Sequence, residues 1–86
     1  MEKEVKILKA LAHPLRLEII KLLSNEESLC VCKIQDFFNA TQSNLSQHLK
    51  ILKEADILAS KKNGGWVYYN LKNKKVIDVI NILKDS

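Results

Sequence analysis

The chain has 86 residues, enough for one domain with a small core and too few for a sensory domain beside a separate binding domain. Its apolar fraction of 47% is high for so small a domain and indicates apolar surface buried against another chain, while its formal net charge of +4 favours nucleic acid as a partner. No stretch is long and apolar enough for a membrane span or a signal peptide, so we expect a cytoplasmic protein with no membrane partner.

The first two helices are predicted to meet at Pro14. The apolar residues of the first helix recur at helical spacing: Val5, Leu8, Leu11 and Ala12. This pattern ends at His13, because a residue that precedes proline is displaced from the helical region. Pro14 then suits the first turn of a second helix, where its missing N–H is not needed. Residues 24–28 form a polar break after that second helix, whose apolar face is Leu15, Ile19, Leu22 and Leu23.

Two further helices follow with about three residues between them, which is the spacing of a helix-turn-helix. Cys30 lies near the cap of the first, short helix and Cys32 lies in its first turn. The apolar residues of this helix are Val31, Ile34, Phe37 and Phe38. After a turn at residues 39–40, Thr41 is a favourable N-cap for the next helix, QSNLSQHLKILKEA. One face of that helix carries Leu45, His48, Leu49 and Leu52.

A β-hairpin and a last helix complete the chain. Residues 57–62 and 66–71 are rich in β-branched or aromatic residues and flank Gly64 and Gly65, which can supply the positive φ angles of a hairpin turn. Residues 73–86 are predicted to form a helix that is apolar over a wide arc. The predicted fold is mainly α with a small β-hairpin, in the order α-α-α-α-β-β-α, and no repeat or linker divides residues 1–86 into more than a single domain.

The outward face of the fourth helix has the chemistry of a nucleic-acid contact. A rotation of about 100° per residue places its leucines on the core side. The opposite side carries short polar, amide and ammonium side chains, which can hydrogen-bond to base edges or phosphates: Ser43, Ser46, Gln47 and Lys50, with Asn44 beside them. The alternative is a solvated helix face. That alternative is weakened because this face has no acidic residue before Glu54 and a basic hairpin follows directly.

Four motifs occur in unbroken order along the chain: ALAHPLRLEIIKLL, LCVC, TQSNLSQHLKILKEADIL and NGGWVYYNL. They resemble, in turn, the second-helix signature, the thiolate box, the turn with recognition helix, and the wing of the ArsR/SmtB metal-sensing winged helix-turn-helix repressors. The resemblance covers nearly the whole chain. It implies a homodimeric transcriptional repressor that releases double-stranded operator DNA when it binds a toxic metal or metalloid ion.

The resemblance also implies where DNA and a second copy of the chain would bind. The recognition helix would be residues 42–54 and the wing residues 57–71. The side chains expected to contact DNA are Thr41, Gln42, Ser43, Asn44, Ser46, Gln47, Lys50, Lys61, Lys62, Asn63 and Tyr68. In the family the first and last helices form the dimer, and the residues expected in that interface are Val5, Leu8, Val76, Val79, Ile80 and Leu83. The alternative for the last helix is packing within its own monomer only.

The ligand positions of the family are matched only in part. Cys30 and Cys32 correspond to the first two thiols of the arsenic-repressor box, and Gln35 stands where a third cysteine would follow. The amino terminus has no cysteine to complete a site. The last helix has Asp78 and no histidine, which argues against the zinc- or nickel-type site at the dimer interface. A two-thiol site is what remains.

A helix end decides whether two thiols so close in sequence can cooperate. Inside a regular helix, side chains at i and i+2 point about 200° apart and could share neither an ion nor a disulfide. At the N-cap, a non-helical conformation allows Cys30 to turn toward Cys32. Helix amino termini also lower the pKa of thiols, which favours the thiolate that binds soft ions or is oxidised.

The sequence leaves several roles open for these two residues. Cys30 and Cys32 are expected to bind As(III), Sb(III) or another soft metal ion with a third ligand from outside the protein, to act as a dithiol redox switch, or to be two small core residues. A permanent disulfide is not expected in the cytoplasm, and no cofactor is required. The alternative of another class is a winged-helix protein-interaction module that never binds DNA. His13 and His48 are interpreted as structural, and the absence of a catalytic constellation predicts that the protein is not an enzyme.

Overall fold

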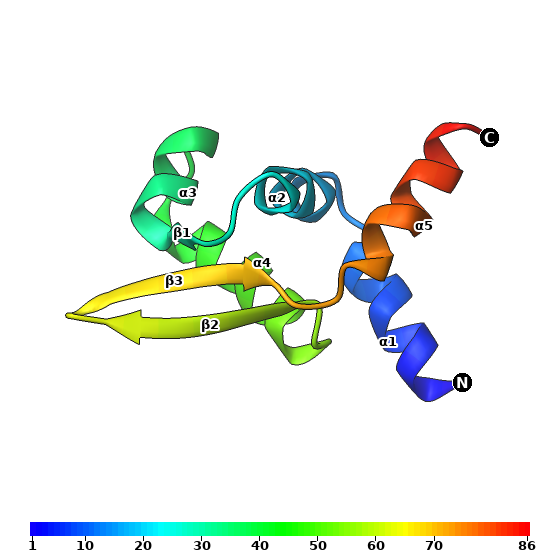
Figure 1. The fold of residues 1–86 in the computed structure, drawn as a ribbon, viewed down its shortest axis with the longest axis horizontal. Coiled ribbons are helices and arrows are strands. Elements are labelled where there is room, and N and C mark those ends of the chain that lie inside the picture. The colour runs from blue at the N-terminus through cyan, green and yellow to red at the C-terminus, as the bar shows by residue number, and fades with distance from the viewer.

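The computed structural model describes all of residues 1–86 as five helices and one three-stranded antiparallel sheet (Figure 1). The helices are α1 (Glu2–Leu11), α2 (Pro14–Ser24), α3 (Val31–Phe38), α4 (Gln42–Glu54) and α5 (Lys75–Lys84). The strands are β1 (Leu29–Cys30), β2 (Leu58–Asn63) and β3 (Trp66–Leu71). The predicted winged helix-turn-helix fold is confirmed, with one additional strand. None of the helices is long and apolar enough to cross a membrane.

Side-chain caps set the starts of α2 and α4. His13 is extended, and its Nδ1 accepts a hydrogen bond from the N–H of Leu15 at 3.1 Å. Pro14 follows in the first turn, which confirms the predicted boundary. Thr41 caps α4 through its hydroxyl oxygen, which accepts the N–H of Asn44 at 3.2 Å. Each cap satisfies one of the N–H groups that a helix start leaves unpaired, and a side-chain cap contributes about 1 kcal/mol.

The turn of the helix-turn-helix is made by Asn39. Its φ of +49° and ψ of +45° place it in the left-handed region, where asparagine is one of the few residues other than glycine that occur regularly. Its N–H donates back to the carbonyl of Asp36, which ends α3. Because Thr41 starts α4 two residues later, the two helices are separated as the sequence predicts.

The wing is the hairpin of β2 and β3. Six residue pairs join the two strands, and Asn63 faces Trp66 at the tip. Gly64 and Gly65 form the turn with φ angles of +58° and +89°, which side chains other than glycine rarely adopt. β2 begins one residue later than predicted, because Ile57 is fully buried and its carbonyl accepts N–H groups from the segment that follows β3.

A third strand that the sequence did not predict lies at the other edge of β3. In β1, Leu29 pairs with Tyr69 and Cys30 pairs with Tyr68, so that β3 is the central strand of the sheet. α3 starts directly after β1 and also contacts β3. Cys30 is therefore at once the last residue of a strand and the N-cap of a helix.

The core is entirely apolar and receives residues from every helix and from β2 and β3. α4 contributes Leu45, Leu49 and Leu52, each at most 1% exposed, which confirms its predicted core face. Burying one such side chain contributes about 1.5–3 kcal/mol. The buried cluster consists of Ala10, Leu11, Ile19, Ile20, Leu23, Ile34, Leu45, Leu49, Leu52, Ala55, Ile57, Leu58, Leu71 and Val76.

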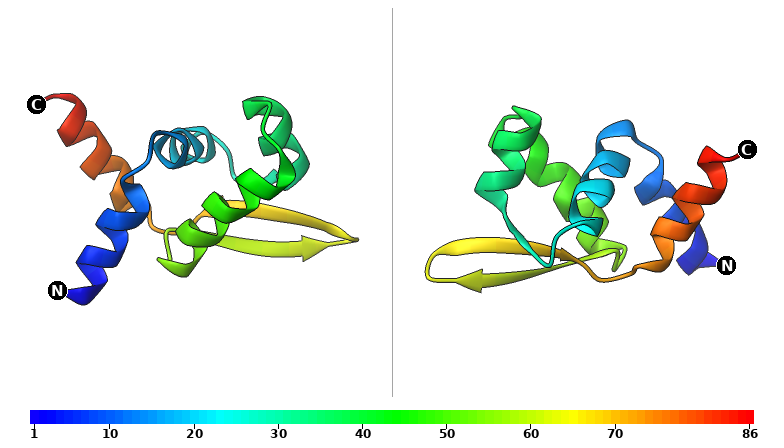
Figure 2. Two further views of the ribbon diagram at one scale, coloured as in Figure 1. Left: turned by 180° about the vertical axis from the view of Figure 1, so that it is seen from behind. Right: turned by 45° about the horizontal axis from the view of Figure 1, so that its top comes forward.

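The molecule is elongated, with extents of 39 × 25 × 23 Å. The wing projects at one end, and both terminal helices, α1 and α5, lie at the other (Figures 1 and 2). α3 and α4 lie toward the end that carries the wing in both views of Figure 2. The predicted DNA-binding side chains and the predicted dimer helices are therefore at different ends of the chain.

Candidate DNA-binding face and thiol cleft

The outer face of α4 is polar, exposed and basic. The six predicted DNA-contacting residues of this helix are all exposed: Gln42, Ser43, Asn44, Ser46, Gln47 and Lys50. The Lys50 ammonium lies 3.9 Å from the carboxylate of Glu54, and both side chains are mostly exposed. Exposed pairs of this kind contribute little, so the Lys50 ammonium stays available to a phosphate. Thr41, also exposed, uses its hydroxyl oxygen for the cap.

The wing carries its two lysines on opposite faces. Lys61 pairs across the hairpin with Tyr68, and Lys62 pairs with Val67. Cross-strand partners share a face of a sheet and neighbours along a strand alternate, so the two ammonium groups lie on different sides. Asn63 at the tip is exposed, whereas Tyr68 is half-buried in the central strand. A hairpin with a cation on each face can meet the phosphates of both strands that border a groove.

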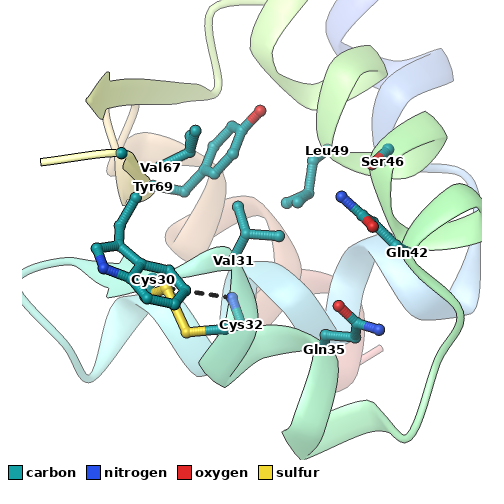
Figure 3. A pocket seen from close by; sticks show the side chains of 11 residues that line it. Cys30, Val31, Cys32, Gln35, Gln42, Ser46, Leu49, Val67 and Tyr69 are labelled. Carbon is teal, nitrogen blue, oxygen red and sulfur yellow. Dashed lines mark hydrogen bonds between the residues drawn. A yellow bond between two sulfur atoms is a disulfide. The ribbon is translucent and has the colours of Figure 1, made fainter. Parts of the chain in front are cut away.

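The two cysteines face each other at the start of α3. Cys30 has φ −61° and ψ 143°, an extended conformation, and its Sγ accepts the N–H of Cys32 at 3.2 Å. The Cα atoms are 5.2 Å apart and the sulfurs are joined as a disulfide, visible in Figure 3. The predicted cap geometry is confirmed. Cys30 is 7% exposed but Cys32 is exposed, which does not fit two small core residues.

The cysteine pair lines a cleft of about 430 Å³ between the start of α3, α4 and β3 (Figure 3). Its apolar side chains are Val31, Leu49, Trp66, Val67 and Tyr69. Its other lining residues are Cys30, Cys32, Gln35, Gln42, Ser46 and Gly65. The cleft thus brings the predicted thiol site together with Gln42 and Ser46 of the predicted DNA-binding face. Sequence reasoning missed it, because its walls come from three separate elements.

No third metal ligand accompanies the thiols. The structure contains no group of three or more histidine, cysteine, aspartate or glutamate side chains that could hold a metal ion. Gln35, which stands in the place of a third cysteine, is half-buried and lines the cleft one helical turn after Cys32. An amide cannot lose a proton to become a thiolate-like ligand. The protein therefore supplies two sulfur atoms at this position.

The two histidines form a separate contact between α2 and α4. The rings of His13 and His48 have centroids 4.4 Å apart and planes inclined by 49°. His48 Nδ1 and the Nε of Arg16 are buried without a hydrogen-bond partner. Burial first, and then the charges of His13 and Arg16, lower the pKa of His48 below its ordinary value of 6.5. This cluster holds neither cysteine, in agreement with the structural role predicted for both histidines.

The terminal helices expose a set of large apolar side chains. Val5 and Leu8 on α1 and Val79 and Leu83 on α5 are 46%, 58%, 37% and 64% exposed. Ile80 is half-buried and packs partly against the core. The prediction is wrong for Val76, which is 2% exposed and belongs to the core of its own chain, so it cannot contact a second copy. Sequence reasoning missed Ile82, which is 70% exposed on the same helix.

Known proteins are similar to this chain along most of its length. Residues 13–60 match the family described as bacterial regulatory protein, arsR family. The uncharacterized HTH-type transcriptional regulator MJ1325 of Methanocaldococcus jannaschii is 40% identical over 84 residues, which covers 98% of this chain and 94% of that protein. The arsenical resistance operon repressor of Bacillus subtilis is 44% identical over 68 residues, 79% of this chain and 65% of the repressor.

Solved structures agree with these sequence matches. HlyU from Vibrio cholerae has a TM-score of 0.84 and 33% sequence identity, and the match covers 95% of this chain and 88% of HlyU. The transcriptional repressor PagR of Bacillus anthracis has a TM-score of 0.82 and 34% identity, covering 95% of this chain and 93% of PagR.

Proposed function

The chain belongs to the arsR family of bacterial regulatory proteins, which are transcriptional regulators and not enzymes, and on that premise we propose that trivalent arsenic or antimony at Cys30 and Cys32 releases it from operator DNA. One observation carries this proposal. The two sulfur atoms line the same cleft as Gln42 and Ser46 of the recognition helix and Trp66 of the wing. An ion held by the thiols would therefore lie between the two elements that read DNA.

The chemistry of the pair supports a soft ion. Thiolates are the preferred ligands of soft metals and metalloids, and a helix amino terminus favours the thiolate form. The exposed side chain of Cys32 gives the ion access from solvent. The name of the similar Bacillus subtilis protein, arsenical resistance operon repressor, points to the same class of effector.

The route of coupling runs through the sheet. Cys30 ends β1, which pairs with β3, the inner strand of the wing, and α3 contacts β3 as well. A change in the cap of α3 would therefore change the position of the wing relative to α4. Two copies of the recognition helix must meet successive major grooves one helical turn apart, so a small displacement misaligns them. A coupling free energy of about 1–3 kcal/mol changes operator affinity five- to hundredfold.

We propose that the DNA-binding form is a homodimer joined through α1 and α5. The exposed apolar side chains of these helices lie at the end of the molecule opposite the wing (Figure 2). Closed two-fold dimers are the commonest oligomers and suit palindromic sites. In such a dimer the two wings would project outward and both recognition helices would remain free.

A dithiol–disulfide switch is the second candidate, favoured by the pairing of the two sulfurs in the structure. Oxidation would join the sulfurs of Cys30 and Cys32 and release two protons and two electrons to an oxidant such as a peroxide or an oxidised thiol. It would act on the same cap and the same cleft as the metalloid. The signal would differ, but the route to the wing would not.

A titration of the promoter of the protein's own gene tests the proposal. The reduced protein should bind this duplex, and arsenite or antimonite should lower its affinity at least fivefold. A variant with both cysteines changed to serine should bind equally well and ignore the metalloid, since serine is a good N-cap. The same titration with a mild oxidant in place of the metalloid tests the redox candidate. If neither metalloid nor oxidant changed the affinity of the wild type, both candidates would be excluded.

A further inference from the structure

We infer that the effector best suited to this cleft is a monosubstituted organic arsenical, RAs(OH)₂, in preference to inorganic arsenite. The inference rests on the proposed function, because it assumes that Cys30 and Cys32 are the effector site. It goes further by naming the kind of arsenic compound that two thiols and an adjoining apolar space would select.

The number of thiols sets the first condition. Arsenite has three exchangeable oxygen ligands, whereas RAs(OH)₂ has two, and its As–C bond persists. Condensation of RAs(OH)₂ with the two cysteine thiols breaks two As–O bonds, forms two As–S bonds and releases two molecules of water. Arsenic stays trivalent and no oxidant is needed. Arsenite at the same site would keep one hydroxyl for which the protein offers no third sulfur, since no third ligand accompanies the pair.

The surroundings of the thiols set the second condition. Gln35 fills the position of the missing thiol with a half-buried amide. Beside the thiols, five apolar side chains line the cleft: Val31, Leu49, Trp66, Val67 and Tyr69. A hydroxyl placed against such a wall loses its contact with water, whereas a carbon substituent gains from being buried there.

The cleft is large enough for the substituent. Its volume of about 430 Å³ lies in the usual range of small-molecule sites. A cavity of about 150 Å³ is sufficient to hold benzene, so a phenyl group fits with space to spare. Trp66 is 57% exposed and offers an aromatic surface that a bound ring would cover.

The substituent would also strengthen the response to the effector. Gln42 and Ser46 form the α4 side of the cleft, so the organic group would lie against two side chains of the DNA-binding face. Arsenic alone would act through the cap of α3. The organic derivative would in addition occupy the space between the recognition helix and the wing, and should release DNA at lower concentration.

Direct binding to the reduced protein tests this inference. Phenylarsonous acid, methylarsonous acid and arsenite would be titrated separately while the fluorescence of Trp66, the single tryptophan of the chain, is recorded. We expect phenylarsonous acid to bind about tenfold or more tightly than arsenite, with the methyl compound between them. Release of operator DNA should follow the same order.

Two variants separate the contribution of the thiol count from that of the cleft. Gln35→Cys should raise the affinity for arsenite about a hundredfold, because a third tethered ligand acts at high effective concentration, and should leave phenylarsonous acid nearly unchanged. Gln35→Ser is its matched control and should behave like the parent. Ser46→Phe fills part of the cleft from the exposed side of α4, and should weaken phenylarsonous acid while leaving arsenite unaffected.

The outcomes distinguish this inference from the proposed function. Arsenite that bound the parent as tightly as phenylarsonous acid would overturn the inference and leave the proposed function standing. A preference for the phenyl compound that survived Ser46→Phe would likewise overturn it, because the ring would then lie elsewhere. If none of the three compounds bound or released DNA, the proposed function itself would fail.

Discussion

The imidazole rings of His13 and His48 lie 4.4 Å apart and join the cap of α2 to the middle of the recognition helix. Nδ1 of His13 accepts the N–H of Leu15 and so holds its ring in place. His48 Nδ1 has no partner, and Arg16 places a positive charge nearby. A second proton on His48 would add charge to a site that is already cationic and partly desolvated. The contact is therefore stable when His48 is neutral.

The first prediction concerns the pH dependence of stability. The pKa of His48 is lowered by burial and by its cationic neighbours, so the unfolded chain takes up the proton more readily than the folded one. The contribution of His48 to stability is then complete above its ordinary pKa of 6.5 and is lost as the pH falls through that value toward the lowered one. The melting temperature should therefore fall between about pH 7.5 and about pH 5.5.

The variant His48→Asn removes the titrating group and should show a smaller fall over the same interval. His13→Asn is a useful companion, because asparagine retains the N-cap while the neighbouring imidazole is lost. Circular dichroism melts of the three proteins at both pH values give the comparison. Equal pH slopes for the parent and His48→Asn would contradict this prediction.

The second prediction separates base reading from phosphate contact. Gln47→Ala removes an exposed amide from the outer face of α4 and should reduce the preference for operator over random duplex, by about 1–3 kcal/mol for one lost base contact. Lys62→Ala should weaken binding to both duplexes alike and reduce the dependence of log affinity on log salt by about 0.9. Fluorescence anisotropy at several salt concentrations measures both effects.

Lys84→Ala is the matched control for the lysine variant. It removes the same charge from α5, at the far end of the molecule from the wing (Figure 1). Its salt dependence should equal that of the parent. An equal effect of Lys62→Ala and Lys84→Ala would indicate that net charge, and not the wing, determines binding.

The third prediction concerns the dimer. Leu83 is 64% exposed on α5, so Leu83→Asp should leave the fold intact and produce monomers. Ile80→Asp should also separate the copies, but Ile80 packs partly against the core and its replacement should lower stability as well. Sedimentation equilibrium and a thermal melt distinguish these two results.

Phe37→Asp provides the control for the exposed leucine. Phe37 is 66% exposed on α3 and lies at the end that carries the wing, so its substitution should not change the association state. A Leu83→Asp protein that sedimented as a dimer would exclude this part of α5 from the interface.

The fourth prediction tests the cap of the recognition helix. The hydroxyl of Thr41 accepts the N–H of Asn44, and Thr41→Ala should lower the free energy of unfolding by about 1 kcal/mol. Thr41→Ser keeps the acceptor and should remain close to the parent. Urea unfolding measures the difference, and equal midpoints for the alanine and serine variants would refute the role of the cap.

Features with local causes could be predicted from the sequence, and features that depend on distant segments could not. Pro14 and Thr41 mark helix starts through their own geometry and hydrogen bonding, so both boundaries were predicted correctly. β1 has only two residues and no periodicity, and its partner strand lies far along the chain. Val76 and Val79 share one wide apolar arc, and only the packed structure shows that the first is buried and the second exposed.

The candidate site divides in the same way. The position of Cys30 at a helix cap follows from residues close to it, so the facing arrangement of the two cysteines was predicted. The cleft was not, because its walls are set by the tertiary placement of α3, α4 and β3. The roles of its residues in binding an effector or DNA stay predictions.

The pairing of β1 with β3 also fixes the order in which the protein can mature. The hairpin of β2 and β3 joins neighbouring segments and can form within about 1–10 μs, whereas β1 must close a loop from Leu29 to Tyr69 before it can pair. During synthesis the segment with both cysteines leaves the ribosome well before β3 exists. Until β3 arrives, Cys30 has no strand partner and the cleft has no wall on the wing side. A nascent chain that can hold its effector in the cleft is consequently one whose wing is already complete.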